Sequence, residues 1–190
     1  NAGLNLSFTS NLGLGGRYGD ATDFEAVRTG AKRRYTVLRG GAYLSMPVLE
    51  DWTLALRGNL QFAADPLVPG EQFGIGGSAT VRGYEEREIT GDSGVSAAVE
   101  LIGPRWEGSF GATKVDLRLL AFADAGSVRN QNAAACSGTR TQCNLGSIGL
   151  GARLGTGPVQ TRLSVANALE DGASTRRGDW RTHFSMSASF

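Results

Sequence analysis

The feature that most constrains this chain is a period-two alternation of apolar and polar residues, which returns in about eight segments. In one of them Val95, Val99 and Leu101 alternate with Ser96 and Glu100. Successive side chains of a β-strand point to opposite faces, so each segment predicts a strand with one apolar face. The segments are 4–9, 36–48, 52–62, 92–101, 115–124, 148–154, 159–165 and 182–190. We therefore expect an all-β chain with antiparallel strands.

The two faces of these predicted strands differ in charge. One face carries Arg, Asp, Glu, Asn and Gln, whereas the other carries almost no charge. A soluble β-sandwich would bury the apolar faces between two sheets, and a membrane barrel would turn them to lipid around a wet lumen. Long connections follow Ser10, Phe62, Gly126 and Ala166, and shorter ones follow Val48, Ile102 and Leu154. Outer-membrane barrels alternate long outer loops with short periplasmic turns, so this pattern favours a curved, incomplete wall of a transmembrane antiparallel β-barrel.

Composition agrees with a membrane barrel and excludes other classes. The chain has 190 residues, enough for one domain, and its net charge of +1 gives no bulk field for nucleic acid. It contains no run of about 18 apolar residues, as a transmembrane helix would require. Trp52 and Phe62 bracket one predicted strand, and Trp180 and Phe190 bracket another. A strand of about ten residues, tilted by ~45°, spans ~23 Å, close to the ~25 Å apolar band between aromatic girdles.

A glycine-rich stretch between two predicted strands is too long for a tight turn. Gly74, Gly76 and Gly77 allow backbone conformations closed to other residues, and Gly83 adds a second soft point directly after Arg82. Long loops in compact proteins are usually functional or disordered. Apolar residues in this stretch give it a reason to pack against a surface. We expect the glycine loop, residues 66–91, to fold back on itself and carry Arg82 at its tip.

Several short motifs in and around this loop occur together in one order. They are Pro66-Leu67, Glu71-Gln-Phe73, Gly76-Gly77, Val81-Arg-Gly-Tyr84, Gly91-Asp92, Gly94, Glu100-Leu101 and, on a later strand, Phe122-Ala-Asp124-Ala-Gly126. In combination they resemble the two-partner secretion transporters of the bacterial outer membrane, the haemolysin and filamentous-haemagglutinin secretion type. The terminal Phe190 resembles the strand signal that the barrel-assembly machinery reads.

The resemblance implies a sixteen-stranded pore in the bacterial outer membrane, preceded by periplasmic POTRA domains. Residues 1–190 would supply roughly the C-terminal half of that barrel, without its earlier strands or its POTRA domains. The implied partners are a secreted exoprotein, outer-membrane lipid and the barrel-assembly machinery. The implied function is secretion of one large haemolysin-like or adhesin-like protein.

The resemblance also implies where the functional residues lie. The glycine loop would enter the lumen, and Arg82 would pair with Asp124 on the wall. Glu100 also has lumen-facing parity, so it is the main competitor of Asp124 for Arg82. The loop motif consists of Gly76, Gly77, Val81, Gly83 and Tyr84. Further lumen-wall positions are Asp92, Glu100, Phe122 and Gly126.

Other chemistry finds little support in the residues. Cys136 and Cys143 lie in one predicted outer loop, and an oxidising compartment makes a disulfide the default. Zinc would need more ligands than one distant histidine can add, so we expect no metal and no cofactor. An outer-membrane hydrolase would need His183 as a base beside Ser185 or Ser187, yet no acidic residue that could orient it is evident nearby. We therefore expect no enzymatic activity and no nucleic-acid binding.

Two alternatives to a secretion pore stay open. One is a barrel of the same superfamily that inserts other outer-membrane proteins, and the number of POTRA domains would separate the two. The other is a small closed barrel that acts as an adhesin or structural protein, since about eight strands suffice for closure. The glycine loop argues against it, because side chains fill the interior of a small barrel.

Overall fold

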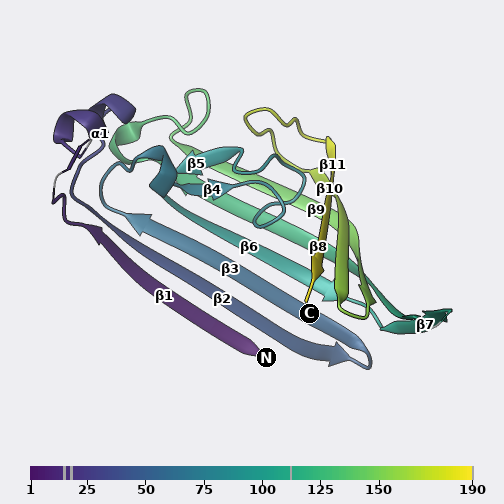
Figure 1. Ribbon diagram of the computed structural model, residues 1–190. Coiled ribbons are helices and arrows are strands. Elements are labelled where there is room, and N and C mark those ends of the chain that lie inside the picture. Colours follow the sequence, from purple (N-terminus) through teal and green to yellow (C-terminus); the bar gives the residue numbers. More distant parts are fainter. Residues whose placement is uncertain (15, 18, 112, 190) are drawn as a thin grey trace.

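The computed structural model describes residues 1–14, 16–17, 19–111 and 113–189. In this part of the chain, nine strands form one antiparallel sheet and two short strands form another (Figure 1). The strands are β1 (Ala2–Asn11), β2 (Tyr35–Leu49), β3 (Trp52–Ala63), β4 (Phe73–Ile75), β5 (Ile89–Gly91), β6 (Ser93–Ile102), β7 (Trp106–Phe110), β8 (Thr113–Arg129), β9 (Gln142–Thr156), β10 (Val159–Ala168) and β11 (Trp180–Ala188). The helices are α1 (Ala21–Val27) and two 3₁₀ turns, Pro69–Glu71 and Gln131–Ala133.

Eight strands form the wall in the order β1-β2-β3-β6-β8-β9-β10-β11, and β7 pairs only with β8. This confirms the all-β, antiparallel fold expected from the alternation. Strands β1 and β11 lie at opposite ends of this order and do not pair with each other in the described residues. None of the described helices is long and apolar enough to cross a membrane.

The side-chain alternation predicted from the sequence sets the two faces of the wall. On β8 the buried residues Leu120, Phe122 and Asp124 alternate with exposed residues such as Leu119. On the outer face large apolar side chains are exposed, for example Leu150 at 68% and Phe184 at 66%. The wall is thus apolar on one face and carries its charges on the other.

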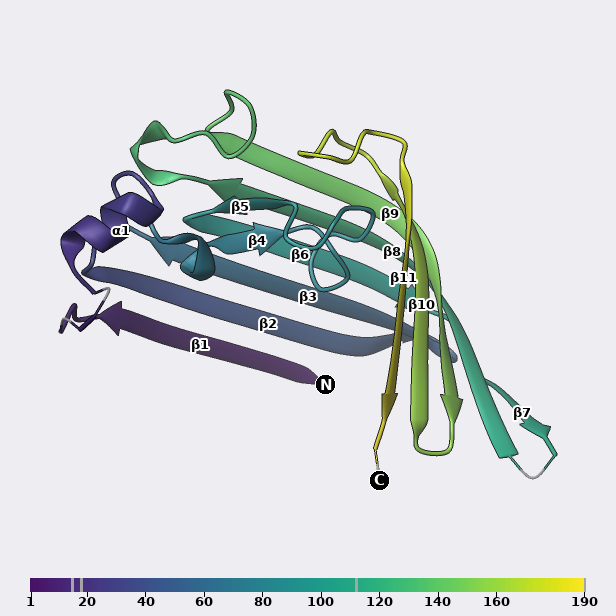
Figure 2. The same cartoon turned by 45° about the horizontal axis from the view of Figure 1, so that its top comes forward.

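The glycine loop lies on the charged, concave face of the wall (Figure 2). Its base is the β4–β5 pair, in which Phe73 lies opposite Gly91 and Ile75 opposite Ile89. A buried apolar cluster joins the loop to the wall and consists of Ile75, Val81, Tyr84, Ile89, Val128, Cys143, Leu145 and Ala168. The main described core therefore lies between the loop and β8–β10.

Four local details differ from the sequence-based expectations. The predicted polar loop before β2 contains the seven-residue helix α1. The Asp23 carboxylate caps its first turn by accepting the Asp20 N–H at 3.0 Å. The connection after β6 contains β7. Strand β8 runs to Arg129 rather than ending near Gly126, because β9 pairs with it along this whole length. For the same reason Cys143 lies within β9 and not in the outer loop. The expected assembly signal Phe190 lies outside the described residues.

Candidate functional site: an arginine-anchored loop on the concave face

The glycine loop closes on itself through its first two motif glycines. Gly76 and Gly77 have φ values of 108° and 90°, a region that L side chains rarely adopt. A Cβ on Gly76 would lie 2.4 Å from the Glu85 carbonyl oxygen, so no side chain fits there. The Glu86 carboxylate accepts hydrogen bonds from the N–H and the hydroxyl of Ser78, both at 2.8 Å. These contacts hold residues 76–88 as one folded unit that presents Arg82.

Arg82 is held by two carboxylates on the wall. Its Nε and Nη2 donate to the two carboxylate oxygens of Asp124 at 2.8 and 2.7 Å, and its backbone N–H donates to Asp124 at 3.0 Å. Its Nη1 donates to Glu100 on β6 at 2.6 Å. Glu100 is thus a second partner of Arg82 rather than a competitor of Asp124. We call Arg82, Asp124, Glu100 and Phe122 the Arg82 cluster.

The fourth member of the cluster, Phe122, lies against the face of the Arg82 guanidinium group. The Arg82 guanidinium carbon lies 3.4 Å from the centroid of the Phe122 ring, a cation–π contact. A Cβ on Gly149 of β9 would lie 2.4 Å from the Phe122 ring, so the absence of a side chain there leaves room for the aromatic. A planar guanidinium suits this site because it can bind carboxylates through its edge while its face stacks on a ring.

The Arg82–Asp124 pair is shielded from solvent. The side chains are 8% and 0% exposed. Ser147 on β9 adds a hydroxyl donor to Asp124 at 3.4 Å. Removal of one partner from a buried pair typically costs about 3–5 kcal/mol, because the other charge loses its compensation. The pair is therefore a buried, bidentate polar contact that holds the loop on the wall.

The motif residues on either side of Arg82 contact the wall as well. Val81 lies against Gly126, where an added Cβ would be 3.0 Å from a Val81 methyl carbon. Gly83 has a φ of 105°, and its Cβ position lies 3.3 Å from the Ser147 Cβ. The hydroxyl of the fully buried Tyr84 lies 2.9 Å from the carbonyl oxygens of Gly146 and Glu170, which share its single donor hydrogen. The sequence Val81-Arg-Gly-Tyr84 thus docks as one unit.

Glu88 ties the loop to the β10–β11 connection, a contact that sequence reasoning missed. Its carboxylate accepts the Thr175 hydroxyl at 2.6 Å and the N–H groups of Thr175 and Ser174 at 2.8 and 2.9 Å. Partial burial raises the pKa of Glu88, but these hydrogen bonds, with another from the Glu85 N–H, outweigh it and lower the pKa to about 2. Glu88 is therefore ionised at neutral pH and holds the connection against the loop.

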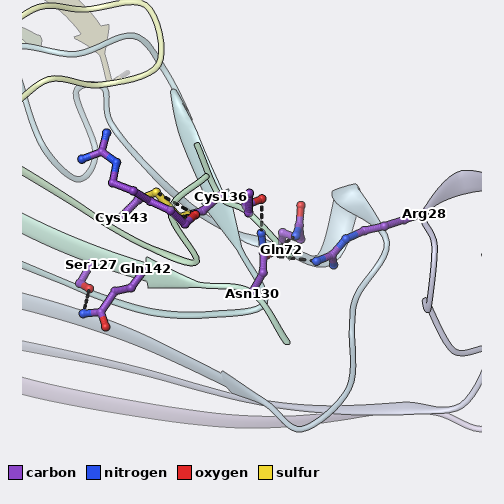
Figure 3. The surroundings of a disulfide bond; sticks show 9 residues. Arg28, Gln72, Ser127, Asn130, Cys136, Gln142 and Cys143 are labelled. Atoms are coloured by element: carbon purple, nitrogen blue, oxygen red, sulfur yellow. Dashed lines mark hydrogen bonds between the residues drawn. A yellow bond between two sulfur atoms is a disulfide. The ribbon is translucent and has the colours of Figure 1, made fainter. Parts of the chain in front are cut away.

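Asp92 lies at the base of the loop and not on the open wall. It is fully buried, and its carboxylate accepts the Leu67 and Gln131 N–H groups at 2.9 and 2.8 Å. The two terminal guanidinium nitrogens of Arg28, Nη1 and Nη2, also donate to it. Nη2 of Arg28 also donates to the side-chain oxygen of Asn130, 3.1 Å away, and Figure 3 includes both residues. Asp92 thus joins the α1 connection, the glycine loop and the β8–β9 connection. Arg28 is one of several arginines in its segment and has no distinguishing sequence signal.

Cys136 and Cys143 are joined by a disulfide, with their Cα atoms 6.1 Å apart (Figure 3). The bond links the β8–β9 connection to the second residue of β9. In the described part of the chain, no group of three or more His, Cys, Asp or Glu side chains could hold a metal ion. Nε2 of His183 is buried without a hydrogen-bond partner among the described residues, so no serine is bonded to it there.

A wall with an apolar outer face, a charged inner face and a loop docked inside has the architecture of a membrane-barrel transporter. Residues 1–154 match the family described as haemolysin secretion/activation protein ShlB/FhaC/HecB. The chain belongs to that family of outer-membrane transporters, for which a secreted partner protein is implied. No curated protein matches the chain.

Proposed function

We propose that this chain forms part of an outer-membrane pore that secretes one large partner protein of the haemolysin or adhesin type. The observation that carries the proposal is the Arg82 cluster, which fixes the glycine loop on the concave face of a wall that is apolar outside. Membership of the haemolysin secretion/activation family supports the same reading.

In this proposal the eight wall strands make up about half of a sixteen-stranded barrel. The exposed apolar face, which includes Leu150 and Phe184, contacts outer-membrane lipid. POTRA domains and further strands complete the transporter, and Phe190 belongs to the segment that the barrel-assembly machinery reads. The charged face lines the lumen.

The glycine loop, in the same proposal, is the element that controls the lumen. It covers the part of the wall formed by β6, β8 and β9, and it is anchored at three levels. Asp92 holds its base, the Arg82 cluster holds its tip, and Glu88 links it to the β10–β11 connection. A secreted polypeptide can pass on this side of the barrel in two ways. Either the glycine loop shifts away from the wall, or the polypeptide passes beside the docked loop.

Depletion of the transporter in cells tests the function. We expect one large protein to disappear from the culture medium while the levels of other outer-membrane proteins stay unchanged. Quantitative mass spectrometry of the medium and of the outer-membrane fraction measures both. A general loss of outer-membrane proteins, with no specific loss from the medium, would support the assembly function and contradict secretion.

A further inference from the structure

Three arginines lie directly opposite one another on neighbouring strands of the wall. In the register, Arg118 of β8 pairs with Arg153 of β9, and Arg153 pairs in turn with Arg162 of β10. Directly opposed residues of an antiparallel pair point to the same face. Arg118 shares the side-chain parity of Asp124, so the three side chains all point to the concave face. We call them the arginine row.

The arginine row carries an excess of positive charge. The cavity that they line together with Arg57 contains one carboxylate among the described residues, that of Glu100. Glu100 already binds Arg153 on one oxygen and Arg82 on the other. The side chains of Arg57, Arg118 and Arg162 make no hydrogen bond or ion pair within the described residues.

Such an arrangement is unfavourable without a ligand. Like charges directly opposite each other destabilise a strand pair, and a concave site lined by one sign of charge focuses its field on a partner of the opposite sign. The row lies toward the short-turn end of the wall, since Arg153 is three residues before the end of β9 and Arg162 three residues after the start of β10. The docked glycine loop lies beyond it, toward the long connections.

We propose that the arginine row binds the carboxylates of an acidic, extended segment of the polypeptide in transit. This inference rests on the proposed secretion function and names the chemistry that the pore wall recognises. Two interstrand spacings separate the outer arginines, roughly 10 Å, which an extended chain covers with three or four residues. Guanidinium groups bind carboxylates through paired, charge-assisted hydrogen bonds. Lipid does not reach the row, because the row faces away from the apolar surface.

The test uses the purified full-length transporter in a nonionic detergent and fluorescein-labelled hexaglutamate as the probe. Fluorescence anisotropy measures its Kd for the native protein and for the double variant Arg118→Gln/Arg162→Gln. We expect the Kd to rise about tenfold or more in this variant, since each charge-assisted hydrogen bond contributes roughly a factor of ten. The matched control is Arg176→Gln/Arg177→Gln, which removes the same charge from the exposed β10–β11 connection and leaves the Kd unchanged.

Two further variants guard against a folding defect. The single variant Arg162→Gln changes an exposed side chain and raises the Kd in the same direction. The variant Arg118→Lys/Arg162→Lys keeps the charge but loses the paired hydrogen bonds, so its Kd should lie between those of the native protein and of the double Gln variant. Equal affinity of the native protein for hexaglutamate and a neutral Gly-Ser peptide would overturn the proposal, as would equal losses in the row and control variants. Because no cargo is present, this result is independent of the depletion experiment, which alone decides the secretion function.

Discussion

Replacement of Arg82 by alanine tests whether the Arg82 cluster holds the glycine loop on the wall. The change removes the hydrogen bonds that the Arg82 side chain donates to Asp124 and Glu100, and its stacking contact with Phe122. Asp124, whose side chain is fully buried, then keeps only the Arg82 backbone N–H and the hydroxyl of Ser147 as donors.

The expected cost follows from the burial of this pair. Loss of one partner from a buried ion pair costs about 3–5 kcal/mol, which shifts the ratio of docked to undocked loop by roughly two to four orders of magnitude. Arg82 also attracts the carboxylate of Glu100, and the variant loses this attraction too. We therefore expect the cost of Arg82→Ala to lie toward the upper part of that range. Arg82→Lys keeps the charge but loses the bidentate geometry and the planar stacking, so we expect an intermediate loss.

Hydrogen–deuterium exchange of the purified transporter measures the docking equilibrium directly. We expect amides in residues 76–88 to lose protection in Arg82→Ala, whereas amides of the wall strands keep it. The matched control is Arg87→Ala on the same loop, because Arg87 is exposed and its side chain donates only to backbone carbonyls of Pro69 and Gln72. Unchanged protection in Arg82→Ala, or equal losses in both variants, would refute the assigned role. Secretion should fall in Arg82→Ala while barrel levels in the membrane stay close to normal.

Three further predictions concern the surroundings of this cluster. The single reversals Arg82→Asp and Asp124→Arg should each impair secretion, and the combined swap should restore only part of it, because a second carboxylate on β6 then faces the new aspartate; full activity in either single reversal would count against the pair. Replacement of Cys136 and Cys143 by serine should lower the unfolding free energy by about 2–3 kcal/mol, from the short closed loop, and leave secretion intact; loss of transport at normal barrel levels would show a further role. The pKa of Glu88 is about 2 in the folded protein against an ordinary 4.5, so its stabilising contribution is complete above pH 4.5 and is lost as the pH falls toward 2. Limited proteolysis of the β10–β11 connection should therefore become faster as the pH falls through this range, and Glu88→Gln should abolish this pH dependence.

The period-two alternation predicted that Asp124 and Glu100 share one face of the wall, whereas Asp92, expected on the same wall, lies buried at the base of the glycine loop. Side-chain parity is a local property of a strand, and Asp124 and Glu100 therefore fall on the predicted face. The resemblance to a known family, rather than periodicity, indicated that Arg82 meets this face. The sequence did not show that Glu100 shares Arg82 with Asp124, because that depends on the register between β6 and β8.

Contacts between distant connections could not be predicted. Arg28 meets Asp92 across 64 residues, and Glu88 meets Thr175 across 87 residues, and neither spacing has a sequence signature. Helix α1 has seven residues, too few for a helical period to be recognised. The extension of β8 and β9 beyond the alternating segments arises from their mutual pairing, which also brings Cys143 into a strand.

Docking of the glycine loop on the concave wall can be tested in the folded transporter by an engineered disulfide. The variant Val81→Cys/Gly126→Cys, in a Cys136→Ser/Cys143→Ser background, tests it most directly. A Cβ on Gly126 would lie 3.0 Å from a Val81 methyl carbon, which is about the separation of a Cβ from the opposite sulfur in a disulfide. The methyl group of Ile75, 2.9 Å from the same position, has to move slightly.

Mass spectrometry of proteolysed outer membranes measures whether this engineered bond forms. If the loop is docked as described, the bond forms spontaneously in the membrane, and its yield falls when Arg82→Ala is added. Two freely alkylated thiols under oxidising conditions, in a barrel that is otherwise normally folded, would contradict the docked position of the loop.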